Sequence, residues 1–233
     1  MKKFRLYLDK DKETTWINEM AKKGYALTGF FAGVYTFEAC TPGEYEYQID
    51  FGNKFFSVNN DYKEFMEENG IEAVCLWGYW IFLRKRASEG EFVLYTDVDS
   101  SIEHYTKILK MFKIVTIIEL LCFLLEVFGA INGVAVGVFG MLIIGILIIA
   151  LMRATLSTKR LINELKERKG EPVPSGFATG NISPVLISGL LLNVCATTLT
   201  HSSVSHTIVM TTQIVAIVAM LVGLYQSRNV FKK

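Results

Sequence analysis

The chain is poor in the residues that most often build metal sites, disulfide frameworks and catalytic sets. Its 233 residues include three histidines, four cysteines and four prolines. No two cysteines form a C-x-x-C pair, so neither a disulfide framework nor a zinc site is predicted. A phosphate-binding loop, a nucleophile elbow and a paired-glycine dinucleotide turn are also missing. We therefore expect no metal, no cofactor and no catalytic residues, and the sequence does not predict an enzyme.

Long apolar runs are missing from the first 103 residues and dominate the rest. The first part carries 12 Lys and Arg against 18 Asp and Glu. This acidic balance argues against direct nucleic-acid binding through a basic face. Its length suits one small soluble domain, which we place at residues 1–104 and expect in the cytoplasm. The remainder, residues 105–228, is predicted to be a membrane region.

Four apolar segments in the second part resemble membrane spans, which take about 20 residues as helices. They lie near 114–128, 134–152, 184–199 and 208–224. Short turns join the first span to the second and the third to the fourth, which predicts two antiparallel helical hairpins. A polar, partly helical loop at 153–181 connects the hairpins.

The basic residues of the membrane region indicate its orientation. They precede the first span, occur along the central loop and follow the fourth span, whereas the two short turns contain none. Lys and Arg near span ends mark the cytoplasmic side. We therefore expect a multi-pass protein of the cell membrane with both termini in the cytoplasm.

Two glutamates interrupt the first span. Glu119 and Glu126 are seven residues apart and share one helix face, and a carboxylate in hydrocarbon normally faces the bundle interior or a wet cavity. Asn193 and Gln213, on the third and fourth spans, are polar side chains able to hydrogen-bond across helices. Two alternatives stay open: a polar clasp between the hairpins, or a proton or cation pathway that uses Glu119.

The first 104 residues alternate between strand and helix patterns. Strands are expected in "KKFRLYLD", "YALTGFFAGVYTFEA", "EYEYQIDFG" and "IEAVCLWGYWIFLRKR". Helices are expected in "DKETTWINEMAKKGY" and "NNDYKEFMEENG", each with a capping residue before it and a glycine stop. The order predicts an α+β domain, an antiparallel sheet with two helices that is ferredoxin-like in outline. An all-α four-helix transmembrane region follows, joined by a helix in "DVDSSIEHYTKILKMFK" that continues into the first span.

Aromatic residues are the candidates for a binding face on this domain. Trp16, Tyr45, Tyr47, Trp77 and Trp80 have the bulk to line a ligand pocket or to form a docking surface for a protein partner. The alternative is that they form the core of a small domain that is short of other large side chains.

Four runs of the first domain resemble the DUF2812 family of bacterial membrane-associated proteins. They are "TTWINEMAKKGYALTGFFAGVYTFE", "GEYEYQIDF", "YKEFMEENGIEAV" and "GYWIFLRK". The resemblance covers roughly residues 1 to 110 and implies no established reaction. It implies a setting beside PadR-like transcription regulators in Gram-positive bacteria, and by analogy a regulatory or sensory role at the membrane.

Two functions are consistent with these features. The first is a membrane-anchored sensory or regulatory protein whose cytoplasmic domain binds a protein partner or a small ligand, without catalysis. The alternative is a small transporter, or a transporter accessory subunit, that uses Glu119 in a proton or cation pathway. The expected partners are the lipid bilayer, a regulator or transporter subunit, and further copies of the chain, with no direct binding of nucleic acid.

Overall fold

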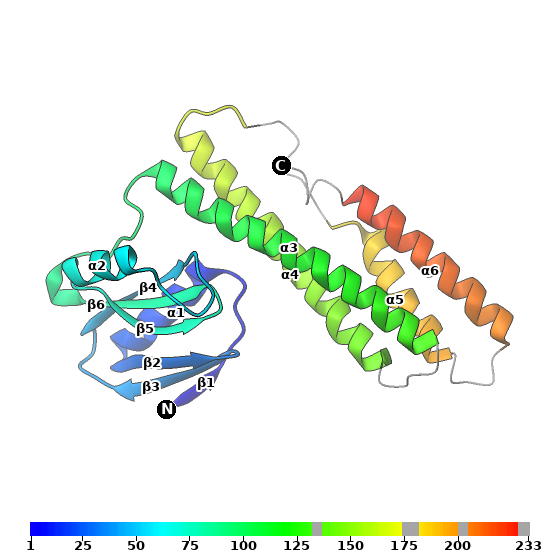
Figure 1. The fold of residues 1–233 in the computed structure, drawn as a ribbon, viewed down its shortest axis with the longest axis horizontal. Coiled ribbons are helices and arrows are strands. Elements are labelled where there is room, and N and C mark those ends of the chain that lie inside the picture. The colour runs from blue at the N-terminus through cyan, green and yellow to red at the C-terminus, as the bar shows by residue number, and fades with distance from the viewer. Residues whose placement is uncertain (132–136, 174–181, 200–204, 228–233) are drawn as a thin grey trace. The chain divides into compact units, whose positions relative to one another are not determined.

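The computed structural model describes residues 1–131, 137–173, 182–199 and 205–227. The chain divides into two compact units, Met1–His104 and Tyr105–Lys233, with the strands in the first and long helices in the second (Figure 1). The prediction of an α+β region followed by a helical region is confirmed. The beginning of the span predicted at 134–152, the end of the loop predicted at 153–181, and Arg228 lie outside the described residues.

The first unit repeats one topology twice. The first half contains β1 (Lys2–Phe4), α1 (Lys10–Lys22), β2 (Tyr25–Phe31) and β3 (Val34–Ala39). The second half contains β4 (Tyr45–Phe51), α2 (Asn60–Glu68), β5 (Glu72–Trp77) and β6 (Trp80–Arg86). Each half forms a three-stranded antiparallel sheet, in the orders β1-β3-β2 and β4-β6-β5. Both halves are therefore strand–helix–strand–strand units with the last strand in the centre.

Two sheets replace the single sheet predicted from the sequence, and the ferredoxin-like outline is not confirmed. Alternation of apolar and polar residues identifies the buried face of a strand, but it does not identify the strand's neighbours. In the structure β2 and β5 lie against each other, while the ladders of hydrogen bonds stay within each half. The two halves are thus joined by side chains, which strand patterns cannot reveal.

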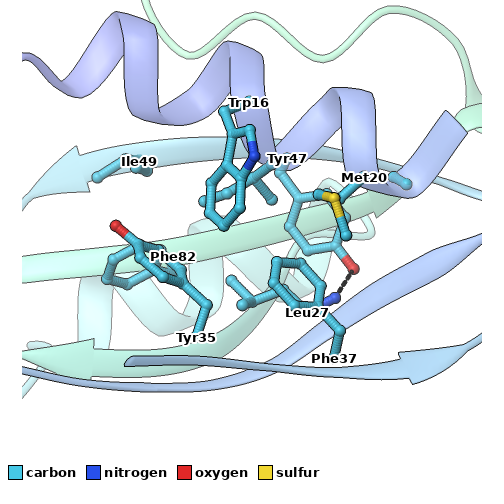
Figure 2. Close-up of a cluster of buried hydrophobic side chains, with 10 residues drawn as sticks. Trp16, Met20, Leu27, Tyr35, Phe37, Tyr47, Ile49 and Phe82 are labelled. Atoms are coloured by element: carbon cyan, nitrogen blue, oxygen red, sulfur yellow. Dashed lines mark hydrogen bonds between the residues drawn. The ribbon is translucent and has the colours of Figure 1, made fainter. Parts of the chain in front are cut away.

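Helix α1 packs on strands of both halves, β2 and β4. Asp9 caps the helix by accepting the backbone N–H groups of Asp11 and Lys12 at 3.1 and 3.2 Å, which satisfies donors that the first turn leaves open. Figure 2 shows Trp16 and Met20 reaching from α1 toward the strands. Both side chains are buried in one cluster with residues from each sheet.

Polar contacts fix α1 on the second half. The Asn18 side chain donates to the Tyr47 carbonyl at 2.9 Å and accepts the Tyr47 N–H at 2.8 Å. The Tyr47 hydroxyl accepts the Leu27 N–H at 2.9 Å, which joins β4 to β2 (Figure 2). Each of these groups is buried or partly buried, so leaving it unpaired would cost about 1–3 kcal/mol.

The helical unit is built from four helices. They are α3 (Val98–Ile131), α4 (Gly137–Arg168), α5 (Pro184–Leu199) and α6 (His206–Gln226). All four contribute to one cluster of buried side chains, for example Phe123, Met141, Leu190 and Met220. Helix α3 begins in the first unit and crosses the boundary at His104 without interruption. Helix α4 is also continuous, so residues 153–168 of the predicted loop are helical.

Two helices in the described part of the chain are long and apolar enough to cross a membrane, Phe139–Arg168 and His206–Gln226. A third apolar helix, Pro184–Leu199, is shorter. Length and composition of these helices indicate an association with a membrane. They support two spans, whereas the sequence predicts four.

The outward-facing side chains of these helices are also apolar. On α3, Ile117, Leu121, Leu125 and Phe128 are between 50 and 70% exposed. Large exposed apolar side chains continue along α4 and α6, among them Phe139, Ile143, Ile146, Ile214 and Leu221. Soluble proteins rarely leave apolar surfaces of this extent in water, whereas hydrocarbon covers them without cost.

Candidate functional site: the polar face of β4

Strand β4 alternates between apolar and polar residues, and its polar side is only partly open to water, because Gln48 is half-buried and Asp50 is buried. Tyr47 and Ile49 are buried in the core. Glu46, Gln48 and Asp50 lie on the opposite face, at every second position. These three side chains hold the segment that leads into α3.

Two of them bind the backbone of one residue. The N–H of Phe92 donates to Glu46 Oε2 at 3.2 Å, and Gln48 Nε2 donates to the Phe92 carbonyl at 2.9 Å. The Phe92 ring is buried with Met66, Ile81 and Leu83. Side-chain groups of β4 therefore satisfy both backbone groups of Phe92, and the ring anchors the same residue in the core.

Asp50 is the centre of the site. Its side chain is buried, and Oδ1 accepts the Tyr95 hydroxyl at 2.5 Å and the Phe51 N–H at 2.7 Å. Oδ2 accepts the hydroxyl of Tyr62, which α2 supplies. A carboxylate removed from water needs such partners, because burying a charge without them costs several kcal/mol.

Helix α3 reaches the same carboxylate through His104. Its Nδ1 lies 3.3 Å from Asp50 Oδ1, and its side chain is 2% exposed. The imidazole packs on the Tyr95 ring, with 4.4 Å between ring centroids. Asp50 is thus in contact with α2, with the segment before α3 and with α3 itself, all within the first unit.

Tyr62 and Tyr95 donate stable hydrogen bonds to Asp50. Burial, followed by the charge of Asp50, raises the pKa of Tyr95 above its ordinary value. The same two causes, in the same order, raise the pKa of Tyr62. Both phenols stay protonated at neutral pH and keep donating to the carboxylate. With Asp50 and His104 buried and both tyrosines half-buried, the arrangement is suited to joining elements of the first unit.

A second, partly buried acid, Glu13, lies on α1. The Tyr35 hydroxyl donates to Glu13 Oε1 at 2.5 Å. Burial raises the pKa of Glu13 to about 7, against a smaller lowering by the Tyr35 hydrogen bond. The Tyr35 ring lies edge-on to Trp16, with 4.8 Å between centroids. Glu13 therefore titrates near neutral pH, in surroundings that are mostly aromatic.

The structure brings together two of the four intramembrane candidates. Gln213 Nε2 on α6 donates to Asn193 Oδ1 on α5 at 2.9 Å, and both side chains are buried. Glu126 lies instead at the α3–α4 contact, where a Cβ on Gly140 would be 3.0 Å from its carboxyl carbon. Among the described residues, neither Glu126 nor the half-buried Glu119 is joined to the amide pair.

The aromatic candidates do not form one face. Trp16 and Tyr47 are buried in the core of the first unit. Tyr45 is half-buried beneath the Arg84 guanidinium, whose carbon lies 4.6 Å from the ring centroid. Trp77 and Trp80 are half-buried on either side of the β5–β6 turn. In the described part of the chain, no three His, Cys, Asp or Glu side chains are grouped to hold a metal ion.

Sequence reasoning missed the residues around Asp50. The alternation of β4 placed Glu46, Gln48 and Asp50 on one face, but a polar face is ordinarily assigned to solvent. The available signal was the apolar residues beyond the last strand, including Phe92, which indicate that this segment is itself buried. His104 was visible only as the one histidine of the domain.

These features define a class of protein, an α+β unit that continues through one helix into a set of apolar helices. The family model DUF2812, described as a protein of unknown function, matches residues 9–117. Over that segment the chain is similar to DUF2812, and the resemblance noted in the sequence is confirmed. The match extends past the first unit to Ile117 on α3, so it includes Asp50 and all of its partners. No curated protein and no solved structure matches the chain.

Proposed function

We propose that the chain is a membrane-anchored sensory or regulatory protein. Its α+β unit binds a protein partner or a small ligand, and α3 transmits the bound state toward the membrane. The observation that carries the proposal is the set of contacts between β4 and the start of α3. Asp50 contacts His104 of α3, and Glu46 and Gln48 on the same face bind the segment that precedes the helix.

The membrane part of the proposal is a four-span arrangement with both termini in the cytoplasm. Its support is the apolar outward surface of α3, α4 and α6 and the absence of Lys and Arg from the two short turns of the sequence. Single cysteines test it in a chain whose four native cysteines are replaced. Ser203→Cys should react with an impermeant reagent on intact cells, and Glu171→Cys only after permeabilisation. The reverse pattern would exclude this orientation.

The regulatory part follows from the continuity of α3. Asp50 contacts α2 through Tyr62 and α3 through His104. A ligand or partner that moves α2 or the segment around Tyr95 must change the hydrogen bonds of Asp50. That change reaches α3, which runs on into the apolar region as one helix. The family's implied setting makes a PadR-like transcription regulator the first partner to test.

Hydrogen exchange of the full chain in lipid nanodiscs tests the coupling. Asp50→Asn keeps the volume of the side chain but removes its charge, and it should speed exchange in residues 98–112 by about tenfold or more, because the start of α3 opens more easily. Tyr25→Phe, a change at an exposed hydroxyl, is the matched control and should leave exchange unchanged. Adding the purified regulator should alter exchange in the same residues. If neither Asp50→Asn nor the regulator changes hydrogen exchange in residues 98–112, this mechanism is excluded.

A further inference from the structure

Five aromatic rings follow one another at the end of the first unit where the hairpins turn. The centroid distances are 4.9 Å for Phe31–Trp77, 5.7 Å for Trp77–Phe56, 4.7 Å for Phe56–Phe55 and 5.3 Å for Phe55–Tyr79. The rings come from the end of β2, the β5–β6 turn and the loop between β4 and α2. We call this group, Phe31, Phe55, Phe56, Trp77 and Tyr79, the aromatic tip.

The tip is exposed. Phe31 is 68% exposed, Phe55 63%, Phe56 49% and Tyr79 38%. Beside it, Phe4 and Leu6 of the first strand region are also exposed and lie against the β2–β3 turn. Contiguous apolar surface of this kind is unfavourable in water and marks a surface that is covered in the working protein.

The backbone that positions the exposed rings is strained at two residues. Ala32 and Phe56 are the non-glycine residues with positive φ in the described chain, at 45° and 51°, and both lie at the tip. The Phe56 N–H donates to the Gly78 carbonyl at 2.7 Å, which locks the loop onto the β5–β6 turn. Strained backbone of this kind persists where the surrounding structure enforces it, and it often has a functional reason.

The charges around the tip are of one sign. Segments 28–36, 51–58 and 76–82 contain a single charged residue, Lys54. The adjacent strand β1 adds Lys2 and Lys3. No acidic side chain occurs in these segments, although acidic residues outnumber basic ones in the domain as a whole. An apolar surface whose own segments carry a cation and no acidic residue is complementary to an anionic one.

We propose that the aromatic tip inserts into the headgroup region of an anionic bilayer. Trp and Tyr favour this interface, where one end of the side chain is apolar and the other is wet. Phenyl rings reach about 5–10 Å to the acyl boundary, and nearby Lys side chains bind anionic headgroups. The proposal rests on the membrane anchoring proposed above. About 24 Å of α3 separates Val98 from Ile114.

The intrinsic fluorescence of the full chain provides the test. All three tryptophans lie in the first unit, Trp16 in the core and Trp77 and Trp80 near the tip. We would reconstitute the protein in phosphatidylcholine liposomes containing phosphatidylglycerol, with and without lipids brominated near the headgroup. The brominated lipids should quench the wild-type fluorescence. A variant with Trp77→Phe and Trp80→Phe, which retains only Trp16, should not be quenched.

Three further variants distinguish insertion of the rings from mere proximity of the domain to the bilayer. Phe31→Ser with Phe55→Ser keeps every tryptophan and should lose about half of the quenching or more, because the inserted rings are gone. Phe65→Ser, at an exposed ring on α2, is the control and should lose none. Lys54→Glu should weaken quenching when phosphatidylglycerol is present and not in phosphatidylcholine alone.

Two results would overturn the proposal. If brominated lipid has no effect while acrylamide quenches Trp77 fully, the tip lies in water. If neither agent quenches Trp77, a second copy or another protein covers the tip. In either case, outside labelling of Ser203→Cys would show that the membrane anchoring still stands. If that labelling also fails, both the proposed function and the insertion of the aromatic tip are excluded.

Discussion

Asp50 and Tyr95 are 45 residues apart in the chain, and their side-chain oxygens meet at 2.5 Å. The chain between these two residues contains α2, β5 and β6. One carboxylate therefore joins β4, at the start of the second half, to the segment that follows β6. Because Asp50 is buried, protein hydrogen-bond donors must replace the water molecules that an exposed carboxylate would bind.

Replacing Asp50 should therefore lower the stability of the first unit. Asp50→Asn puts an amide nitrogen where a carboxylate oxygen accepts a hydrogen bond, and we expect a loss of about 2 kcal/mol in the free energy of unfolding. Urea unfolding of the detergent-solubilised chain, followed by tryptophan fluorescence, measures this, because all three tryptophans report on the first unit. Tyr95→Phe should lose about 1 kcal/mol. Equal stability of Asp50→Asn and wild type would mean that the hydrogen bonds of the carboxylate do not stabilise the fold.

The stability of the first unit should depend on pH through Glu13. Its pKa is raised by burial from 4.5 to about 7, so the folded chain holds this proton more tightly than the unfolded chain. The stability that protonated Glu13 contributes is complete below about pH 4.5 and is lost as the pH rises through about 7.

Glu13→Gln should remove this decline, because the amide still accepts the Tyr35 hydroxyl and carries no charge. Between about pH 5 and about pH 8, the wild type should lose about 2 kcal/mol more than the variant. Urea unfolding at a series of pH values decides the matter. Parallel curves for the two proteins would show that Glu13 is solvated in the fold.

Helices α5 and α6 should tolerate no side chain at their closest approach. A Cβ on Gly223 would lie 2.3 Å from the Leu186 backbone nitrogen, whereas a Cβ on Gly129 of α3 meets nothing within 4 Å. Gly223→Ala should destabilise the helical unit by about 2 kcal/mol, since both clashing groups are backbone. Gly129→Ala should be neutral or stabilising by up to about 1 kcal/mol. The temperature at which helicity is lost in detergent compares them, and a neutral Gly223→Ala would place the two helices farther apart.

The amides of Asn193 and Gln213 should be coupled. Each single change to Leu leaves the other amide buried without its partner and should cost about 1 kcal/mol. The double change removes both amides and should cost less than the sum of the two. Unfolding in SDS, followed by circular dichroism, gives the four free energies of the cycle. Strict additivity would mean that the hydrogen bond of 2.9 Å contributes nothing.

Much of the fold could be predicted because its signals are local. Asp9 and Gly24 bracket α1 as a cap and a stop, and the alternation from Tyr45 to Phe51 defines the buried face of β4. The pairing of the strands could not be predicted in the same way, since Tyr45 opposes Arg86 across 41 residues. The division into two sheets depends on such long-range partners, which no local period encodes.

The candidate site was harder to predict for a related reason. Alternation along β4 puts Glu46, Gln48 and Asp50 on one face, but their partners, Phe92 and Tyr95, come from a segment with no regular pattern. Burial of a polar face becomes visible only when its covering segment is known. The Asn193–Gln213 contact was within reach of the sequence, because few residues are able to hydrogen-bond inside apolar helices.

Helix α3 runs from the first unit into the second as one helix. Between His104 and Glu126 it is uninterrupted, a length of about 33 Å. An α-helix turns as one body, so a rotation of α3 at His104 by the angle of one residue, about 100°, would turn Glu126 by the same angle. In the proposed function, release of His104 from Asp50 would therefore act on the apolar region as a torque, with no need for the chain to lengthen or to unfold.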